Sequence, residues 1–200
     1  MKEIVFATNN AHKLQELREM VGDQFKVLSL NEIGCHDDIP ETATTLEGNA
    51  ELKARYVKQH YGYDCFSDDT GLEIDALGGE PGVYSARYAG GEGHDSEANI
   101  NKVLDKLSGV ARDERTARFR TAVALLVGDK LHLFEGKVEG LIMEERRGTG
   151  GFGYDSIFMP TEGDGRTFAQ MSAIEKNAIS HRGRAVSQLV AHLTKMELWG

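Results

Sequence analysis

Cysteine is scarce in this sequence, and the two cysteines lie far apart. Cys35 and Cys65 form none of the closely spaced pairs that are typical of metal or redox sites. We therefore expect both thiols to be reduced. The sequence also lacks the Gly-x-Ser-x-Gly and His-Glu-x-x-His patterns, so it carries no signature of a serine hydrolase or a zinc peptidase.

Long hydrophobic runs are absent as well. No apolar stretch approaches membrane-spanning length, and the first residues enter a predicted strand at residues 4–7 without a signal-peptide layout. These absences predict a cytoplasmic protein with no membrane partner. Because repeats, linkers and low-complexity segments are also missing, we expect a single domain over residues 1–200.

Positive charge is in deficit. The 23 Lys and Arg residues face 32 Asp and Glu residues, which gives a formal net charge of −9 at pH 7. Affinity for a polyanion depends on many neutralised phosphates, so nucleic acid is not the expected partner. A small phosphorylated ligand needs only a local basic pocket, usually with a metal ion, and is compatible with this balance.

Strands and helices can be predicted from the apolar residues. Continuous apolar runs indicate strands, and apolar residues at helical spacing, such as Leu14, Leu17 and Val21, indicate helices. The predicted strands are residues 4–7, 25–28, 63–66, 116–127, 131–134 and 138–144, and the predicted helices include residues 46–61 and 96–107. Because Gly128-Asp129 fits a hairpin turn, strand directions are mixed and we expect an α/β fold.

The acidic pair Asp68-Asp69 stands at the end of a predicted strand and is followed directly by Thr70-Gly71. Neighbouring side chains of a strand point to opposite faces, so one carboxylate can face a ligand while the protein holds the other. Buried carboxylates require a cation, a shared proton or hydrogen-bond donors. The alternative is an exposed acidic turn, which is common for an isolated pair.

Basic and polar residues that suit a phosphate occur elsewhere. Thr8, Asn10 and Lys13 lie where the first strand leads into a helix, whose free N–H groups favour anions, although Asn10 could simply cap that helix. Lys53 lies at the edge of an apolar helical stripe, from which it could reach into a cleft or remain a surface lysine. Glu41, directly after a proline, is a candidate metal ligand.

Glycines alternate with aromatic residues at residues 148–155. This composition lets the backbone approach a flat ligand while Phe152 or Tyr154 stacks on it; the alternative is a glycine-rich hairpin with aromatic plugs.

Cations gather near the start of the last predicted helix. Lys176, His181, Arg182 and Arg184 occur there, and a helix dipole disfavours positive charge at that end. The cluster therefore indicates a bound anion.

Five motifs occur in order from the first strand to the last helix. They are Thr8-x-Asn10-x-x-Lys13, Ser67-Asp68-Asp69-Thr70-Gly71-Leu72, Gly79-Glu80-Pro81-Gly82-Val83-Tyr84-Ser85-Ala86-Arg87, Gly150-Gly151-Phe152-Gly153-Tyr154-Asp155 and Ser180-His181-Arg182-Gly183. Together they resemble the inosine/xanthosine triphosphate pyrophosphatase family, which removes deaminated purine nucleotides. The resemblance covers essentially the whole chain. It implies an α/β fold with an elongated mixed β-sheet flanked by helices, two lobes with a central substrate cleft, and a homodimer.

The resemblance also implies a reaction: Mg²⁺-dependent hydrolysis of ITP, dITP and XTP to the monophosphate and pyrophosphate. Asp69 would be the general base and, with Glu41, a metal ligand. The residues implied to bind substrate are Thr8, Asn9, Asn10, Ala11, His12, Lys13, Lys53, Thr70, Phe152, Gly153, Tyr154, Asp155, Lys176, His181 and Arg182. The sequence departs from the family at Gly48, where an acid is common, and at Asn9, where glycine is frequent.

Three other functions remain open. The chain could be a related pyrophosphatase acting on modified pyrimidine or methylated nucleotides, a non-catalytic nucleotide sensor, or a metal-dependent phosphatase that releases orthophosphate. The identity of the product and a panel of triphosphates separate them.

Overall fold

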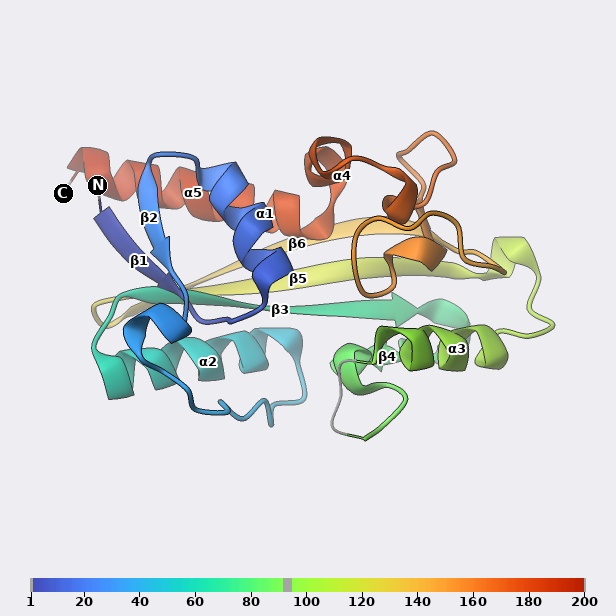
Figure 1. The fold of residues 1–200 in the computed structure, drawn as a ribbon, viewed down its shortest axis with the longest axis horizontal. Coiled ribbons are helices and arrows are strands. Elements are labelled where there is room, and N and C mark those ends of the chain that lie inside the picture. Colours follow the sequence, from blue (N-terminus) through green and yellow to red (C-terminus); the bar gives the residue numbers. More distant parts are fainter. Residues whose placement is uncertain (1, 92–94, 200) are drawn as a thin grey trace. The chain divides into compact units, whose positions relative to one another are not determined.

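The computed structural model describes residues 2–91 and 95–199 and has an α/β fold (Figure 1). Contacts divide the chain into two compact units, in agreement with the two lobes expected. Unit 1 contains Met1–Asp69, Thr121–Gly136 and Gly183–Gly200, and unit 2 contains Thr70–Arg120 and Lys137–Arg182. The expected substrate cleft stays a prediction. No described helix is both long enough and apolar enough to cross a membrane.

The strands form a mixed β-sheet, as predicted. The strands are β1 (Lys2–Phe6), β2 (Phe25–Leu28), β3 (Cys65–Ile74), β4 (Pro81–Gly82), β5 (Thr116–Val127), β6 (Lys130–Ile142) and β7 (Phe158–Pro160). In unit 1 the order is β2-β1-β3-β5-β6, and β1 runs parallel to both neighbours. In unit 2, β4 pairs with β3 and β7 with β6, both antiparallel. Strands β3, β5 and β6 contribute residues to both units.

Unit 1 is a sheet covered by helices on both faces (Figure 1). Its helices are α1 (Ala11–Val21), α2 (Leu46–Tyr61) and the part of α5 (His181–Trp199) that follows Arg182. Alternate residues of β1 enter different cores: Ile4 and Phe6 pack with residues of α1 and α5, whereas Val5 packs with residues of α2. This alternation is the period-2 pattern of a strand that is buried on both faces.

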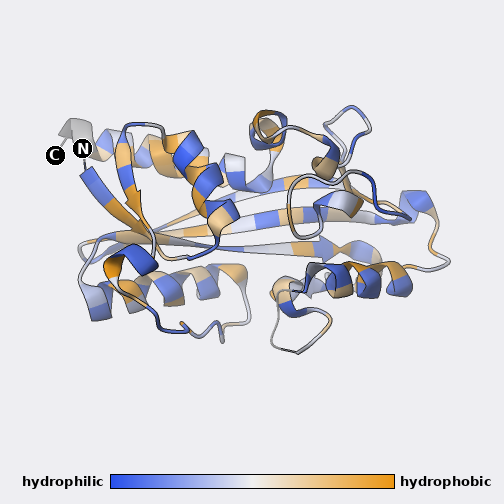
Figure 2. Cartoon of the chain, viewed as in Figure 1, coloured by the Kyte–Doolittle hydropathy of each residue, from blue (hydrophilic) through white to orange (hydrophobic). Residues whose placement is uncertain are grey.

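Unit 2 has an aromatic core. Its helices are α3 (Ser96–Lys106) and α4 (Ala173–Ile179). The rings of Phe119, Phe158 and Phe168 pack together, with the Phe119 and Phe158 centroids 4.5 Å apart. In Figure 2 hydrophobic residues recur in bands on α3, whose Ile100 and Val103 join this core.

Most predicted bounds differ from the structure by two residues or fewer, and two larger errors concern strands. The acidic pair does not end its strand, because β3 continues through Asp68 and Asp69 to Ile74. The strands predicted at 131–134 and 138–144 are one strand, β6, since Gly136 lies inside it without ending it. By contrast, β2, α2 and β5 have the predicted bounds.

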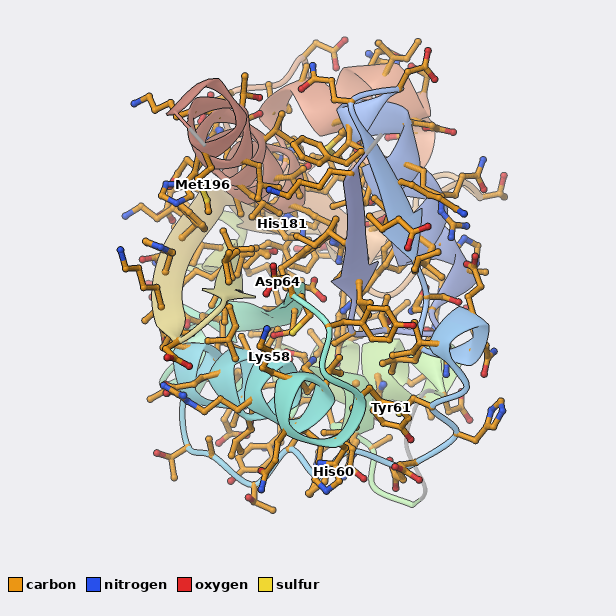
Figure 3. All side chains as sticks on the ribbon, turned by 90° about the vertical axis from the view of Figure 1, so that its left-hand side faces the viewer. Lys58, His60, Tyr61, Asp64, His181 and Met196 are labelled. Atoms are coloured by element: carbon orange, nitrogen blue, oxygen red, sulfur yellow. The ribbon has the colours of Figure 1, made fainter. Side chains whose placement is uncertain are left out.

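A salt bridge fixes the start of β3 in unit 1. Lys58 of α2 lies 2.8 Å from the carboxylate of Asp64, the residue before β3, and both are labelled in Figure 3. The same Asp64 oxygen accepts the backbone N–H of Gly128 at 3.0 Å. Asp64 therefore joins α2, β3 and the β5–β6 turn.

Candidate functional site

The turn between β1 and α1 is an ordered polar segment. The Asn10 side chain caps α1 by accepting the Lys13 N–H at 3.1 Å, and the Asn10 N–H donates to Thr8 Oγ1 at 3.1 Å. Asn9 accepts the Asn31 N–H at 2.8 Å and so holds the chain that follows β2. Asn10 is thus a helix cap, as the alternative interpretation had it. Ala11 and His12, the first residues of α1, have exposed side chains.

Asp68 and Asp69 point to opposite faces of β3, as predicted. Asp68 lies on the α1 face, where its carboxylate is 3.1 Å from Lys13 Nζ. Asp69 lies on the α2 face, where its Oδ2 accepts a hydrogen bond from Asn49 Nδ2 at 3.2 Å. The strand period therefore assigns one carboxylate to the lysine of α1 and the other to α2.

Asp69 is a buried carboxylate whose charge is incompletely balanced. Burial raises the pKa of Asp69 to about 6, and the neighbouring Glu41 and Asp68 carboxylates add to the increase. Lys53 and the Asn49 amide act in the opposite direction. A carboxylate with this pKa can accept a proton near neutral pH and is a better base than an exposed aspartate.

Lys53 is the cation at the centre of these acids. It is 8% exposed, and its Nζ lies 3.0 Å from Glu41 Oε1 and donates to the backbone carbonyl of Asp68. Burial opposes its charge, but Asp68, Glu41 and Asp69 together raise the pKa of Lys53 above its ordinary value. Lys53 is therefore a buried, charged lysine and not the surface lysine of the alternative interpretation.

The carboxylates of unit 1 suit a hard cation. No group of three or more His, Cys, Asp or Glu side chains that could hold a metal is found within residues 2–91 and 95–199. Mg²⁺ does not require one, since it is usually held by one or two carboxylates together with substrate phosphates and water. Glu41 and Asp69 supply two such carboxylates. The pKa of Asp69 is raised first by burial and then by neighbouring carboxylates, whose negative charge a cation would offset.

Unit 2 contains a buried ion pair. Lys176 Nζ lies 2.8 Å from Asp155 Oδ2, with both residues 4% exposed. The Phe152 N–H also donates to this oxygen, at 3.0 Å. Gly151 makes this turn possible, because its φ is +69° and a Cβ there would lie 2.2 Å from Asp155 Oδ2.

Phe152 is the aromatic residue of the glycine-rich segment that meets the cations. Lys176 Nζ lies 4.5 Å and the Arg182 guanidinium carbon 5.1 Å from its ring centroid. The Tyr154 ring is instead buried in the core of unit 2, and its hydroxyl donates to the Ser85 carbonyl. Of the two rings considered for stacking on a base, only Phe152 is partly exposed.

The cations near the last helix belong to two helices. Lys176 lies in the last turn of α4, not at the start of α5, so the predicted conflict with a helix dipole does not apply to it. His181 and Arg182 are buried in the first turn of α5. The His181 ring stacks on Phe119, with centroids 4.6 Å apart.

Two further residues implied to bind substrate, Thr70 and Gly153, lie in β3 and in the glycine-rich segment. Thr70 is a half-buried residue of β3, and Gly153 has a φ of +61° in the turn before Asp155. A Cβ at Gly48 would lie 2.7 Å from Ala43 Cβ, so glycine lets the segment after Glu41 approach α2.

The predictions missed Asn49. Its signal was available, because Asn49 falls beside Ala50 on the buried stripe of α2, where a polar side chain requires a partner.

Comparisons with known proteins agree with the resemblance seen in the motifs. A sequence model of the Ham1 family matches residues 4–192. A dITP/XTP pyrophosphatase of Christiangramia forsetii is 52% identical over 193 residues, which are 96% of this chain and 100% of that protein. A dITP/XTP pyrophosphatase of Bacillus subtilis strain 168 is 48% identical over 191 residues, 94% of this chain and 96% of that protein.

Solved structures are similar over the same length. The HAM1 protein of Coxiella burnetii has a TM-score of 0.88 and 40% identity, covering 98% of this chain and 100% of that one. The Staphylococcus aureus Ham1 protein has a TM-score of 0.87 and 38% identity with the same coverage. The resemblance inferred from the five motifs is confirmed, and the chain belongs to the Ham1 family.

Proposed function

We propose that this chain hydrolyses ITP, dITP and XTP to the nucleoside monophosphate and pyrophosphate, with Mg²⁺ as cofactor. The observation that carries the proposal is the cluster in unit 1, where Lys53 contacts Glu41 and Asp68 and where Asp69 is a buried carboxylate of raised pKa. Curated Ham1 relatives named dITP/XTP pyrophosphatase support the same reaction.

The residues of unit 1 account for the chemistry at the phosphates. Lys13 and Lys53 offset negative charge on the triphosphate and on the departing pyrophosphate. The Asp69 carboxylate accepts the proton of the water that attacks the α-phosphorus. Mg²⁺, held by Glu41 and Asp69, would neutralise phosphate charge and lower the pKa of a bound water.

The residues of unit 2 account for the base. Phe152 offers a ring on which a purine can stack, and its two cationic neighbours can donate to an acceptor. Hypoxanthine and xanthine have an acceptor oxygen at position 6, where adenine has a donor amino group. A donor from Arg182 would bond the former and be left unsatisfied by the latter, at a cost of about 1–3 kcal/mol.

The decisive assay measures products from a panel of triphosphates. The purified protein with Mg²⁺ should release pyrophosphate from dITP, ITP and XTP much faster than from ATP, GTP or modified pyrimidine triphosphates. Release of orthophosphate, a preference for the pyrimidines, or no turnover would support one of the three alternatives instead. Omission of Mg²⁺, with EDTA present, should abolish turnover.

The assembly and location of the enzyme complete the proposal. We propose a homodimer that acts in the cytoplasm on the nucleotide pool. Light scattering during size-exclusion chromatography should give twice the mass of the 22.0 kDa chain, and cell fractionation should recover the protein with cytoplasmic markers.

A further inference from the structure

A buried asparagine joins the two proposed metal-binding segments of unit 1. Asn49 lies near the start of α2 and is 1% exposed. Its Nδ2 donates to Asp69 Oδ2 at 3.2 Å, and its Oδ1 accepts the backbone N–H of Ala43 at 2.9 Å. Ala43 follows Glu41 by two residues. One amide therefore connects the strand that carries Asp69 with the segment that carries Glu41.

The orientation of this amide follows from its two partners. The Ala43 N–H can only donate, so it requires the oxygen end of the Asn49 side chain. The nitrogen end then necessarily faces Asp69, a group that accepts hydrogen bonds when charged. The backbone N–H of Ala43 thus fixes the orientation in which the Asn49 amide donates to the Asp69 carboxylate.

The contact holds one oxygen of Asp69 and leaves the other available. Within the part of the chain that the structure describes, Asn49 supplies the only hydrogen bond that reaches the Asp69 side chain. Since that bond goes to Oδ2, the Oδ1 atom keeps its capacity to accept. A side chain held at one oxygen has a restricted rotation, which is what a correctly placed base requires.

We propose that Asn49 is a positioning residue for the reaction: it orients the Asp69 carboxylate and ties it to the segment that carries Glu41. This inference rests on the proposed function, because the orientation of Asp69 matters only if Asp69 acts in catalysis. In metal sites generally, the carboxylates that bind the metal are themselves oriented by hydrogen bonds from neighbouring groups.

Unit 2 offers a matched control. Asn99 has the same position relative to its helix start: its N–H bonds to the carbonyl of the cap residue Asp95, as that of Asn49 bonds to Thr45. Asn99 Oδ1 accepts the Ala89 N–H at 2.8 Å, but its Nδ2 donates to the carbonyl of Ala86 at 3.1 Å. Asn99 is 5% exposed. The two asparagines differ in whether the amide reaches a carboxylate or a carbonyl.

The test compares four variants with the wild type: Asn49→Leu, Asn49→Asp, Asn99→Leu and Asn99→Asp. Leucine removes both bonds at nearly constant size. Aspartate keeps the bond from the backbone N–H, loses the donor and adds a carboxyl group, and Asn99→Asp makes the same chemical change in unit 2. The measurements are kcat and KM for pyrophosphate release from dITP, the Kd of α,β-imido-dITP, and the melting temperature.

We expect kcat of both Asn49 variants to fall about 10–100-fold. KM and the analogue Kd should change by less than about threefold, because the residue acts through Asp69 and not on the nucleotide. The Asn99 variants should lose comparable thermal stability while kcat stays within about twofold of wild type. If Asn49→Leu does not fold, the comparison of kcat between Asn49→Asp and Asn99→Asp tests the proposal.

Two results would overturn the inference. The first is a wild-type kcat in Asn49→Asp. The second is an equal loss of kcat in the Asn49 and Asn99 variants, since that would make the effect one of general stability. The wild type is assayed first with the same substrate, so that an inactive wild type, which overturns the proposed function as well, is recognised separately.

Discussion

Each compact unit contains a buried aspartate near a buried lysine, and the two arrangements differ in how the acid is satisfied. In unit 2, Asp155 contacts Lys176 directly at 2.8 Å and also accepts a backbone N–H. In unit 1, Lys53 contacts Glu41 and the Asp68 carbonyl, and Asp69 receives only the Asn49 amide among the described residues. Asp155 is therefore held by a cation and a backbone donor in its turn, whereas the raised pKa of Asp69 allows that carboxylate to take up a proton near neutral pH.

The largest expected effect tests the side of this comparison that concerns catalysis. Asp69→Asn should lower kcat by up to about 10⁴-fold, because an amide cannot accept the proton of the attacking water. Pyrophosphate release and circular dichroism measure the rate and the fold. Asp68→Asn, which changes the neighbouring carboxylate that contacts Lys13, serves as the comparison and should retain more activity. A near wild-type rate in Asp69→Asn would remove this residue from the mechanism.

The second effect concerns stability in unit 2. Lys176→Met should destabilise the protein by about 3–5 kcal/mol, because it leaves Asp155 buried and uncompensated. The double variant with Asp155→Asn should recover part of the loss. Lys58→Met is the control, since it breaks the more exposed pair with Asp64 and should cost about 0–1 kcal/mol. Urea unfolding measures all three, and equal losses in Lys58→Met and Lys176→Met would contradict the comparison.

The third effect is a dependence of stability on pH that belongs to unit 1. The ordinary pKa of 3.8 rises to about 6 in folded Asp69, chiefly through burial. Between these values the folded state binds more protons than the unfolded chain, so the contribution of Asp69 to stability falls as pH rises. Above pH 6 the charged Asp69 side chain destabilises the folded state by on the order of 3 kcal/mol.

The measurement is the difference in unfolding free energy between Asp69→Asn and wild type, in EDTA without added metal. That difference should be near zero at pH 4 and should grow in favour of the variant up to about pH 6–7. Subtraction cancels the titrating groups that do not interact with Asp69. A constant difference would show that Asp69 has an ordinary pKa.

The smallest effect concerns the choice of base in unit 2. Arg182→Ala should reduce the ratio of kcat/KM for ITP over ATP by about 10-fold, as expected for the loss of one donor to an acceptor oxygen. Both substrates are assayed with the same enzyme preparation, so that a general loss of activity cancels. An unchanged ratio would exclude Arg182 from base discrimination.

Much of the fold could be predicted, because the faces of helices and strands depend on residues that are close together in the sequence. The prediction of α2 follows from its apolar spacing, and the opposite directions of Asp68 and Asp69 follow from the strand period. The end of β3 could not be predicted in this way. A strand with two carboxylates in its interior contradicts local propensity, and only partners from distant segments make it stable.

The sequence by itself therefore determined the α/β pattern and the helix and strand faces, since these are properties of local order. The five motifs, in their order along the chain, also determined the family. The tertiary structure decided which ring of the glycine-rich segment is partly exposed and which lysine pairs with which acid. It also decided that an amide twenty positions from Asp69 holds that carboxylate. The reason is that burial and hydrogen bonding depend on which distant groups meet, and no local pattern specifies that.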